Sequence, residues 1–403
     1  MFKKITSSKN IREAYQEVFD YFHLENKENR YRGLDGLNLN FFNLFVFNLI
    51  RQIKKEMREF KEIDPALNIY IPKKHNPEKN REIFIYNIKE RVKSQAIYRV
   101  LLGEFEKEFS SRLFSYRPGK SPYNAAYLMA KRYRKFFNTD YVFTADLSNF
   151  SGEIDRTLMM EKLSEFIKDD SVLKLLSVFV NNSFYYQGEF LKPNRGLVIG
   201  CPIFGLLTNF YLNDIDKKFS SRAQFYLRVG DDLIMLDPDK EKLEKNKEEF
   251  LNDVSNLKLK INLDKIFFGQ AKEKFSYLGY NFLAGKISLP DNFVKKIIKS
   301  WQSILIYKNY SQNYKMTILR KIMKNPQKNF NNVFKGIIKS KPQINDSDQI
   351  KLLSESFFKV LTEFLFGKYN SRNRRLLVDK LSESQIKIIS LYKFYLKFHY
   401  DRK

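Results

Sequence analysis

The sequence predicts an α+β protein of two parts: mixed helices and strands over residues 1–285, and basic helices over residues 286–403. Short segments rich in aromatic and β-branched residues recur in the first part and are typical of strands. Apolar residues at three- and four-residue spacing, with little glycine, dominate the second part. Because 403 residues exceed one ordinary hydrophobic core, two or more packed subdomains are expected.

The individual elements follow from the same patterns. Residues 90–109 have the apolar spacing of a helix, and further helices are predicted at 294–307 and 382–397. Three segments are predicted as strands: 141–147, 225–236 and 275–282. The sequence KISLPDN closes the strand-rich part, which puts the boundary near residues 285–292.

Composition limits the kinds of functional site. Cys201 is the only cysteine, so an internal disulfide and a cysteine-based zinc site are excluded, and there are only three histidines. Any catalytic metal must therefore be held by carboxylates, which favours Mg²⁺ or Mn²⁺.

The charge indicates a polyanionic partner. Lys and Arg total 72 against 46 Asp and Glu, a net charge of +26, and residues 286–403 alone carry 25 basic against 8 acidic residues. Nucleic acid is the first partner to expect, although a solvated set of lysine-rich helices would also explain the second part. The most apolar stretch, Leu37–Ile50, is interrupted by asparagines, and MFKKITSSKN lacks the apolar core of a signal peptide. A cytoplasmic protein without a membrane span is expected.

Three aspartates are the candidate catalytic residues. Asp231 and Asp232 follow Gly230 between two apolar strands, so they lie at the tip of a predicted hairpin. Asp146 ends the strand predicted at 141–147, which could lie beside that hairpin in one sheet. Three carboxylates so placed could hold two divalent ions for phosphoryl transfer. Ordinary turn chemistry at Gly230 and a helix N-cap at Asp146 are the alternatives.

Eight short segments, in this order along the chain, resemble the motifs of the reverse transcriptase family. They are RGLDG at 32–36, IPKK and REIFI within 71–85, FSYRPGKS at 114–121, ADLSNF within 141–156, RGLVIGCP within 195–212, VGDD within 225–236, INLDK within 257–265 and FSYLGY at 275–280. The resemblance implies a right-hand polymerase. Residues 1–285 would be the fingers and palm, with an antiparallel palm sheet, and residues 286–403 a basic α-helical thumb or nucleic-acid-binding and assembly region.

The resemblance also implies a role for each matching residue. Asp146, Asp231 and Asp232 would hold two Mg²⁺ or Mn²⁺ ions together with the backbone carbonyl of Leu147. Lys265 would lie near the leaving pyrophosphate and act as an acid, with an ordinary surface lysine as the alternative. The residues implied to bind the nucleotide are Lys74, Arg81, Leu147, Phe150, Ser151, Gly200 and Asn209. Those implied to contact nucleic acid are Arg117, Lys120, Arg195, Gly196, Leu278 and Gly279.

The chain departs from the family pattern at several positions. Val229 replaces the usual tyrosine before the paired aspartates, Val198 and Ile199 replace Pro-Gln, and Ser115 replaces a glycine. Ser151 stands where the family has a Phe or Tyr that collides with a ribose 2′-hydroxyl. A serine leaves room for that hydroxyl and can hydrogen-bond it, which raises relaxed sugar selection or RNA-dependent RNA synthesis as an alternative. The alternative is that Phe150, one position earlier, supplies the aromatic ring of this sugar gate and collides with the 2′-hydroxyl.

The chain lacks recognisable RNase H, intron-endonuclease and retron segments. By elimination it resembles the stand-alone bacterial abortive-infection and defence-associated reverse transcriptases. That subgroup implies DNA synthesis from dNTPs during phage infection, on a dedicated noncoding RNA or without a template, with a nucleic-acid or protein hydroxyl as primer. A companion defence protein and a homo-oligomer are the partners it leaves open. A catalytically silent RNA-binding scaffold is the non-enzymatic alternative.

Overall fold

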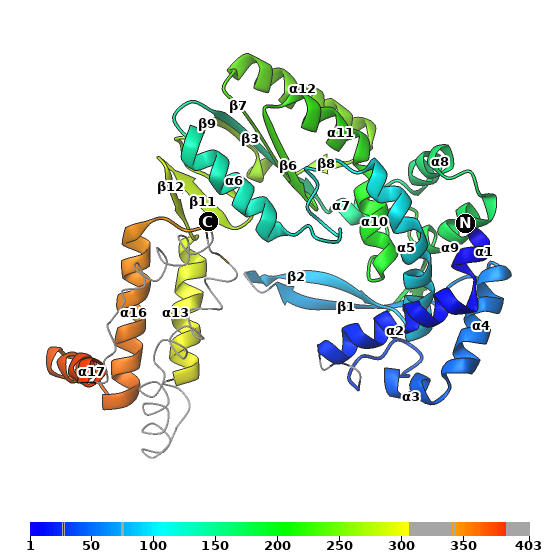
Figure 1. The fold of residues 1–403 in the computed structure, drawn as a ribbon, viewed down its shortest axis with the longest axis horizontal. Helices are drawn as coiled ribbons and strands as arrows, with labels where there is room; N and C mark the ends of the chain where they lie inside the picture. Colours follow the sequence, from blue (N-terminus) through cyan, green and yellow to red (C-terminus); the bar gives the residue numbers. More distant parts are fainter. Residues whose placement is uncertain (26, 28, 74–75, 306–340, 342, 384–403) are drawn as a thin grey trace. The chain divides into compact units, whose positions relative to one another are not determined.

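The computed structural model describes the chain except residues 26, 28, 74–75, 306–340, 342 and 384–403 (Figure 1). The chain divides into two compact units, one of residues 1–125 and 140–269 and one of residues 126–139 and 270–403. This division lies upstream of the boundary predicted near 285–292. The α+β composition predicted from the sequence is confirmed.

The first unit begins with helices that pack on one long helix. The N-terminal helices are α1 (Phe2–Ile5), α2 (Ser8–Leu24), α3 (Leu39–Leu44) and α4 (Val46–Arg58). Helices α1, α2 and α4 contact α5 (Ile88–Glu108), which matches the helix predicted at 90–109. Between α4 and α5 the antiparallel pair β1 (Ala66–Lys73) and β2 (Asn76–Ile85) forms a sheet with the short strands β4 (Phe184–Tyr186) and β5 (Glu189–Leu191).

A second sheet carries the predicted carboxylates. Its strands are β6 (Phe225–Val229), β7 (Asp232–Asp237), β3 (Tyr141–Ser148) and β8 (Lys260–Ile261), in that order, with β9 (Phe267–Gln270) also paired to β3. Helix α12 (Lys240–Asn256) packs on β3 and β7, and α11 (Asn213–Arg222) contacts β6 (Figure 1). Strand β7 pairs antiparallel with both β3 and β6, and all three strands are almost wholly buried, so the segments predicted at 141–147 and 225–236 are confirmed as strands.

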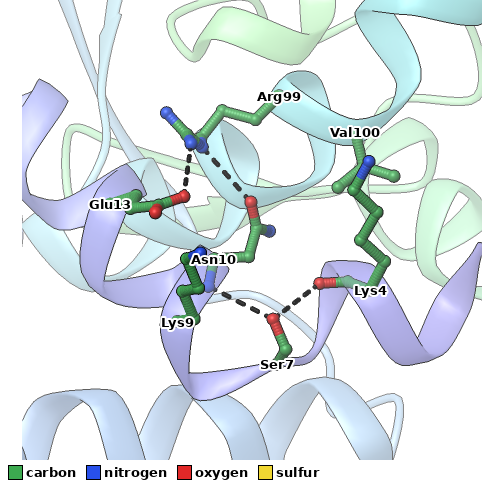
Figure 2. Close-up of a pocket in the computed structure, with 7 residues that line it drawn as sticks. All are labelled: Lys4, Ser7, Lys9, Asn10, Glu13, Arg99 and Val100. Carbon is green, nitrogen blue, oxygen red and sulfur yellow. Dashed lines mark hydrogen bonds and ion pairs between the residues drawn. The ribbon is translucent and has the colours of Figure 1, made fainter.

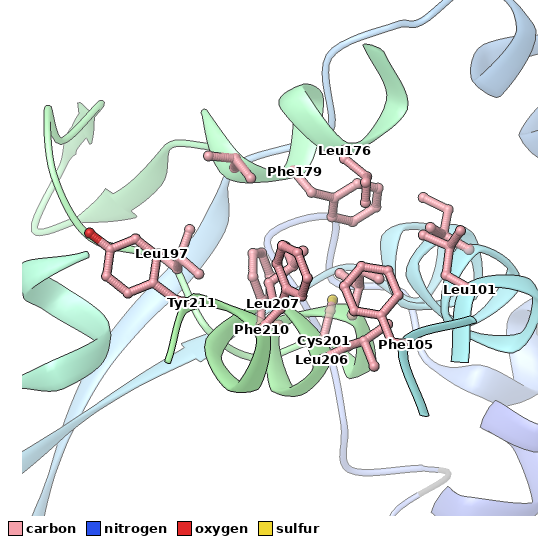
Figure 3. Packing of buried hydrophobic residues seen from close by; sticks show 14 of the residues in the cluster. Leu101, Phe105, Leu176, Phe179, Leu197, Cys201, Leu206, Leu207, Phe210 and Tyr211 are labelled. Atoms are coloured by element: carbon pink, nitrogen blue, oxygen red, sulfur yellow. The ribbon is translucent and has the colours of Figure 1, made fainter. Parts of the chain in front are cut away.

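The core beside this sheet is built from three helices. Side chains from α5, α9 (Asp170–Val180) and α10 (Pro202–Tyr211) interlock there (Figure 3). Aromatic pairs such as Phe105 with Phe210, whose ring centroids lie 4.9 Å apart, fill the space between α5 and α10. Burial of this apolar surface, at about 25 cal/mol per Å², is the main force that holds the helices in place. The remaining helices of the first unit are α7 (Phe150–Glu153) and α8 (Arg156–Phe166).

The second unit joins a small sheet to helices. Strands β10 (Phe275–Tyr277), β11 (Tyr280–Leu283) and β12 (Lys286–Ser288) form an antiparallel meander. Tyr133, near the end of α6 (Pro122–Phe136), packs edge-on against Phe275 and Phe282. This packing explains why residues 126–139 belong to the second unit.

The described part of the second unit also contains three helices after the meander. They are α13 (Asp291–Leu305), α16 (Ser347–Phe366) and α17 (Ser371–Glu383). Helix α13 corresponds to the one predicted at 294–307, whereas residues 384–397 of the helix predicted at 382–397 lie outside the described residues. Among the helices that the structure describes, none is both long enough and apolar enough to cross a bilayer.

Candidate active site

Three carboxylates meet where β3, β6 and β7 come together. Asp146, near the end of β3, is the direct cross-strand partner of Asp232, the first residue of β7. Asp231 lies in the turn between β6 and β7. One ligand oxygen from each of the three lies within 4.8 Å of the others. The strand carrying Asp146 therefore does lie beside the hairpin, and Asp146 is not a helix N-cap, since Asn149 occupies the N-cap position of α7.

The turn that presents Asp231 depends on Gly230. Val229 pairs with Asp232, which leaves Gly230 and Asp231 as a two-residue turn. Gly230 has φ of +65°, a conformation that costs a residue with a side chain free energy. The backbone N–H of Leu147 donates to the carbonyl of Asp231 at 3.2 Å, which draws the turn toward the end of β3.

Burial and the closeness of the carboxylates raise the pKa values of Asp231 and Asp232. Burial, followed by the charges of Asp231 and Asp146, raises the pKa of Asp232 to about 7. Desolvation of its carboxylate, although the residue as a whole is exposed, and the charge of Asp146 also raise the pKa of Asp231. Lys265 offsets part of this repulsion, because its Nζ donates to Oδ2 of Asp146 at 2.8 Å. Burial lowers the pKa of Lys265, but the hydrogen bond and charge of Asp146 outweigh burial and raise it.

These residues fit divalent cations. The three carboxylates supply only oxygen ligands, the type that Mg²⁺ and Mn²⁺ prefer. Repulsion between the carboxylates contributes, after burial, to the raised pKa values of Asp231 and Asp232, and a bound cation would relieve this repulsion. Asp146 is buried and Asp231 exposed, so the cluster opens to solvent on one side. In the described part of the chain, it is the one cluster of three or more side chains suited to hold a metal.

The 195–200 segment lies against the residues that follow β3. The N–H of Gly196 donates to the carbonyl of Ile154, and that of Leu197 to the carbonyl of Ser151, both at 2.8 Å. A Cβ atom on Gly196 would lie 2.5 Å from the carbonyl oxygen of Gly152, so only glycine permits this approach. Gly200 likewise lies against the backbone of Phe84 on β2.

The two candidate sugar-gate residues differ in burial. Phe150 is 8% exposed and belongs to the hydrophobic core cluster. Ser151 is half-buried. Leu147, predicted to offer its carbonyl to a metal, is buried on β3 directly after Asp146.

Four polar residues predicted to touch substrates are engaged within the protein. Asn209 is 1% exposed, and its amide donates to the carbonyl of Ser115 at 2.7 Å. Arg117 binds Glu106 through Nε and Nη2 and donates to two backbone carbonyls. Arg195 donates to the carbonyls of Glu153 and Lys258, and Lys120 to the carbonyl of Ser111. In this structure these side chains hold loops in place.

The other predicted residues are spread over the chain. Arg81 is exposed on β2, whereas Lys74 lies outside the described residues. Leu278 and Gly279 form the β10–β11 turn in the second unit, both with positive φ, and Leu278 accepts a hydrogen bond from Lys341. Their contacts with nucleic acid stay predictions.

Sequence reasoning missed two residues at the site. The N–H of Asn262 donates to the carbonyl of Asp146 at 2.9 Å, and its Nδ2 lies 3.4 Å from that residue's Oδ1. Asn262 belongs to the INLDK segment, which was interpreted for its lysine alone. Arg228 donates to the carbonyl of Gly230 at 2.7 Å, and an arginine inside an apolar strand was its only signal.

A pocket of about 280 Å³ lies elsewhere in the first unit, among α1, α2 and α5. Arg99 crosses it to donate to Asn10 and Glu13 (Figure 2). None of the three aspartates lines this pocket. The carboxylate cluster on the sheet is therefore the stronger candidate for chemistry.

Comparison with known proteins agrees with this site. The family model described as "Reverse transcriptase (RNA-dependent DNA polymerase)" matches residues 71–282, a span that contains all three aspartates and Lys265. Protein YkfC of Escherichia coli is 22% identical over 290 residues, which cover 62% of this chain and 75% of YkfC. The group II intron-encoded protein LtrA of Lactococcus lactis is 24% identical over 170 residues, 41% of this chain and 28% of LtrA.

A solved structure of telomerase from Candida albicans has a TM-score of 0.45 at 12% identity, and the match covers 89% of this chain and 69% of that one. That TM-score is too low to support an argument. The assignment of the chain to a family therefore rests on the family model, which spans more than half of the chain. The chain belongs to the reverse transcriptase family and is a nucleotidyltransferase of the RNA-directed DNA polymerase type.

Proposed function

We propose that this chain extends a primer hydroxyl with dNTPs, copying RNA into DNA, at the cluster of Asp146, Asp231 and Asp232. The observation that carries the proposal is the meeting of three carboxylates within 4.8 Å at the ends of neighbouring strands and the turn of one sheet. When bound there, two divalent ions would supply charge stabilisation for both the entering and the leaving oxygen.

The chain's own residues support this chemistry. Asp146 and Asp232 are held on paired strands and Asp231 in the two-residue turn between β6 and β7, so the sheet and its hairpin set the separation of the three carboxylates. Lys265, whose pKa is raised by Asp146 although burial alone would lower it, is a protonated donor beside the cluster. It is placed to give a proton or a hydrogen bond to a leaving pyrophosphate. Arg81, exposed on β2, supplies a guanidinium suited to a triphosphate.

The test is metal-dependent incorporation of each labelled dNTP and rNTP by protein purified with its bound nucleic acid. We expect product from the wild type and none from Asp231→Ala, Asp232→Ala. The matched control is Asp20→Ala, Asp214→Ala, which removes two carboxylates from exposed helix positions with the same change in net charge. Equal activity in the wild type and the catalytic double variant would refute the proposal. RNA binding by both, with product from neither, would favour the scaffold alternative.

We further propose that the DNA synthesis serves defence against phage, on a dedicated noncoding RNA. The support is the resemblance to stand-alone defence reverse transcriptases, including the divergent residues around the 195–202 and 229–232 segments. Phage plating efficiency on cells that carry the native locus tests it. Protection by the wild type but not by Asp231→Ala, Asp232→Ala is expected, and sequencing of the co-purified nucleic acid identifies the template. Equal protection by both would exclude a catalytic role in defence.

Relaxed sugar selection is the second candidate, and one observation favours it. Because Phe150 is packed in the core, Ser151 is the better placed residue to meet the sugar. Ser151→Phe should then raise the ratio of dNTP to rNTP incorporation. Exclusive use of dNTPs by the wild type, unchanged in Ser151→Phe, would rule this candidate out.

A further inference from the structure

A fully buried ion pair lies directly beneath the turn that carries Asp231. Arg228 on β6 is 1% exposed, and Asp216 on α11 is fully buried. The guanidinium binds the carboxylate through two bonds, Nε to Oδ1 at 2.7 Å and Nη2 to Oδ2 at 2.5 Å. Tyr226 donates its hydroxyl to Oδ1 of Asp216 at 2.7 Å. This arrangement fixes the plane of the guanidinium.

The remaining guanidinium nitrogen, Nη1, is directed to the catalytic turn. It donates to the carbonyl of Gly230 at 2.7 Å. That carbonyl belongs to the peptide plane on the N-terminal side of Asp231. The plane on the C-terminal side is held by Leu147, whose N–H donates to the carbonyl of Asp231. With both flanking peptide planes held, the direction of the Cα–Cβ bond of Asp231 is determined.

We propose that Arg228, oriented by Asp216, is a positioning residue that aims the Asp231 carboxylate at the metal site. The inference rests on the proposed function, because it assumes that Asp231 binds a divalent ion. Arg228 does not touch the reacting atoms. It acts through the Gly230 carbonyl, as partners of metal ligands commonly do, and loss of such a partner typically lowers metal affinity by about 10- to 100-fold.

The buried pair is not explained by stability alone. Burying two charges carries a desolvation cost that their attraction often fails to exceed, and apolar pairs of similar volume are frequently as stable. The pair is also joined to the backbone around it. Nη2 lies 3.4 Å from the carbonyl of Asn209, and the backbone of Arg228 bonds to Arg112 and Phe114. Arg228 thus links α10, α11, β6 and the 112–114 segment to the turn beside the carboxylates.

The test compares Mn²⁺ binding, followed by the electron paramagnetic resonance of free Mn²⁺, with polymerase activity. Arg228→Lys keeps a positive charge beside Asp216, but its single ammonium group cannot also donate to the carbonyl of Gly230 as the guanidinium does. The double variant Asp216→Leu, Arg228→Met removes both charges and the bond to Gly230, and urea unfolding establishes that it is folded. The matched control is Glu56→Leu, Lys93→Met, which removes a buried ion pair between α4 and α5.

Positioning predicts that Arg228→Lys and the Asp216→Leu, Arg228→Met variant both bind Mn²⁺ about 10-fold or more weakly than wild type. The Glu56→Leu, Lys93→Met control should keep wild-type affinity whatever its unfolding midpoint. The inference would be overturned if both variants bound Mn²⁺ with wild-type affinity, or if Arg228→Lys alone did so. The proposed function would still stand. If wild type binds Mn²⁺ no better than Asp231→Ala, Asp232→Ala, the metal site itself is refuted.

Discussion

Replacing Gly196 with alanine tests whether the 195–200 segment is held against the residues after β3 by close backbone contact. The new Cβ atom would meet the carbonyl oxygen of Gly152 at 2.5 Å, against an ordinary contact distance of at least 3.4 Å. Because both partners are backbone, no side chain can rotate away. The segment must therefore move by most of an ångström.

The cost follows from what that movement breaks. Gly196 has φ of +76°, where a side chain costs about 1–2 kcal/mol. The 2.8 Å hydrogen bonds from Gly196 to Ile154 and from Leu197 to Ser151 would stretch, at a net cost of about 1 kcal/mol each. The expected loss is about 3–4 kcal/mol of unfolding free energy. Polymerase activity should fall as well, since Ser151 belongs to the displaced backbone.

Urea unfolding measures this loss, with Gly36→Ala as the matched control. Gly36 lies in the same unit with φ of +69°, but a Cβ atom there meets nothing within 4 Å. The control should therefore lose only the backbone strain, about 1–2 kcal/mol. If Gly196→Ala is no less stable than Gly36→Ala, the close approach to Gly152 does not constrain the segment and the reasoning is refuted.

Three further outcomes follow from the pKa values. Burial and neighbouring carboxylates raise the pKa of Asp232 to about 7, so Mn²⁺ affinity should rise steeply between pH 6 and 8; a flat profile would contradict the shift. Burial would raise the pKa of Glu56, but hydrogen bonds from Lys93 and Gln52 lower it to about 2. Its stabilisation is complete above the unfolded pKa of 4.5 and lost as pH falls toward 2, so Glu56→Gln should flatten acid unfolding there. Burial raises the pKa of Cys201 to about 12, and its thiol should resist alkylation until urea unfolds the chain.

Local patterns were enough to predict the strands that form the site. An apolar run ending in Asp146 and a hairpin signal at Gly230 place carboxylates at strand ends, and antiparallel pairing then brings them together. The contrast between buried strands and polar turns is a short-range signal, so sequence alone carries it.

Contacts between residues far apart in the sequence could not be predicted, because the usable signals are short-range. Arg228 on β6 binds Asp216 on α11, and no pattern in the sequence of either segment predicts this ion pair. Residues 126–139 join the second unit because Tyr133 packs on strands more than a hundred residues later. Neither contact leaves a local pattern. What a charged side chain does therefore depends on the residue that it contacts in the folded protein, and not on its residue type alone.

Intramolecular partners also decide which basic side chains are available to bind phosphate groups. Arg117 and Arg195, predicted from the sequence to contact nucleic acid, bind a carboxylate and backbone carbonyls within the protein. Releasing Arg117, whose side chain is largely buried, would leave its partners without these hydrogen bonds, at a cost of about 1–3 kcal/mol for each buried group. Arg81 is exposed on β2, and Lys265 lies against the carboxylates themselves. We therefore expect the triphosphate to draw on Arg81 of the β1–β2 hairpin and on Lys265 for its positive charge, and Arg117 to hold the backbone at Ser110 and Leu113 in place.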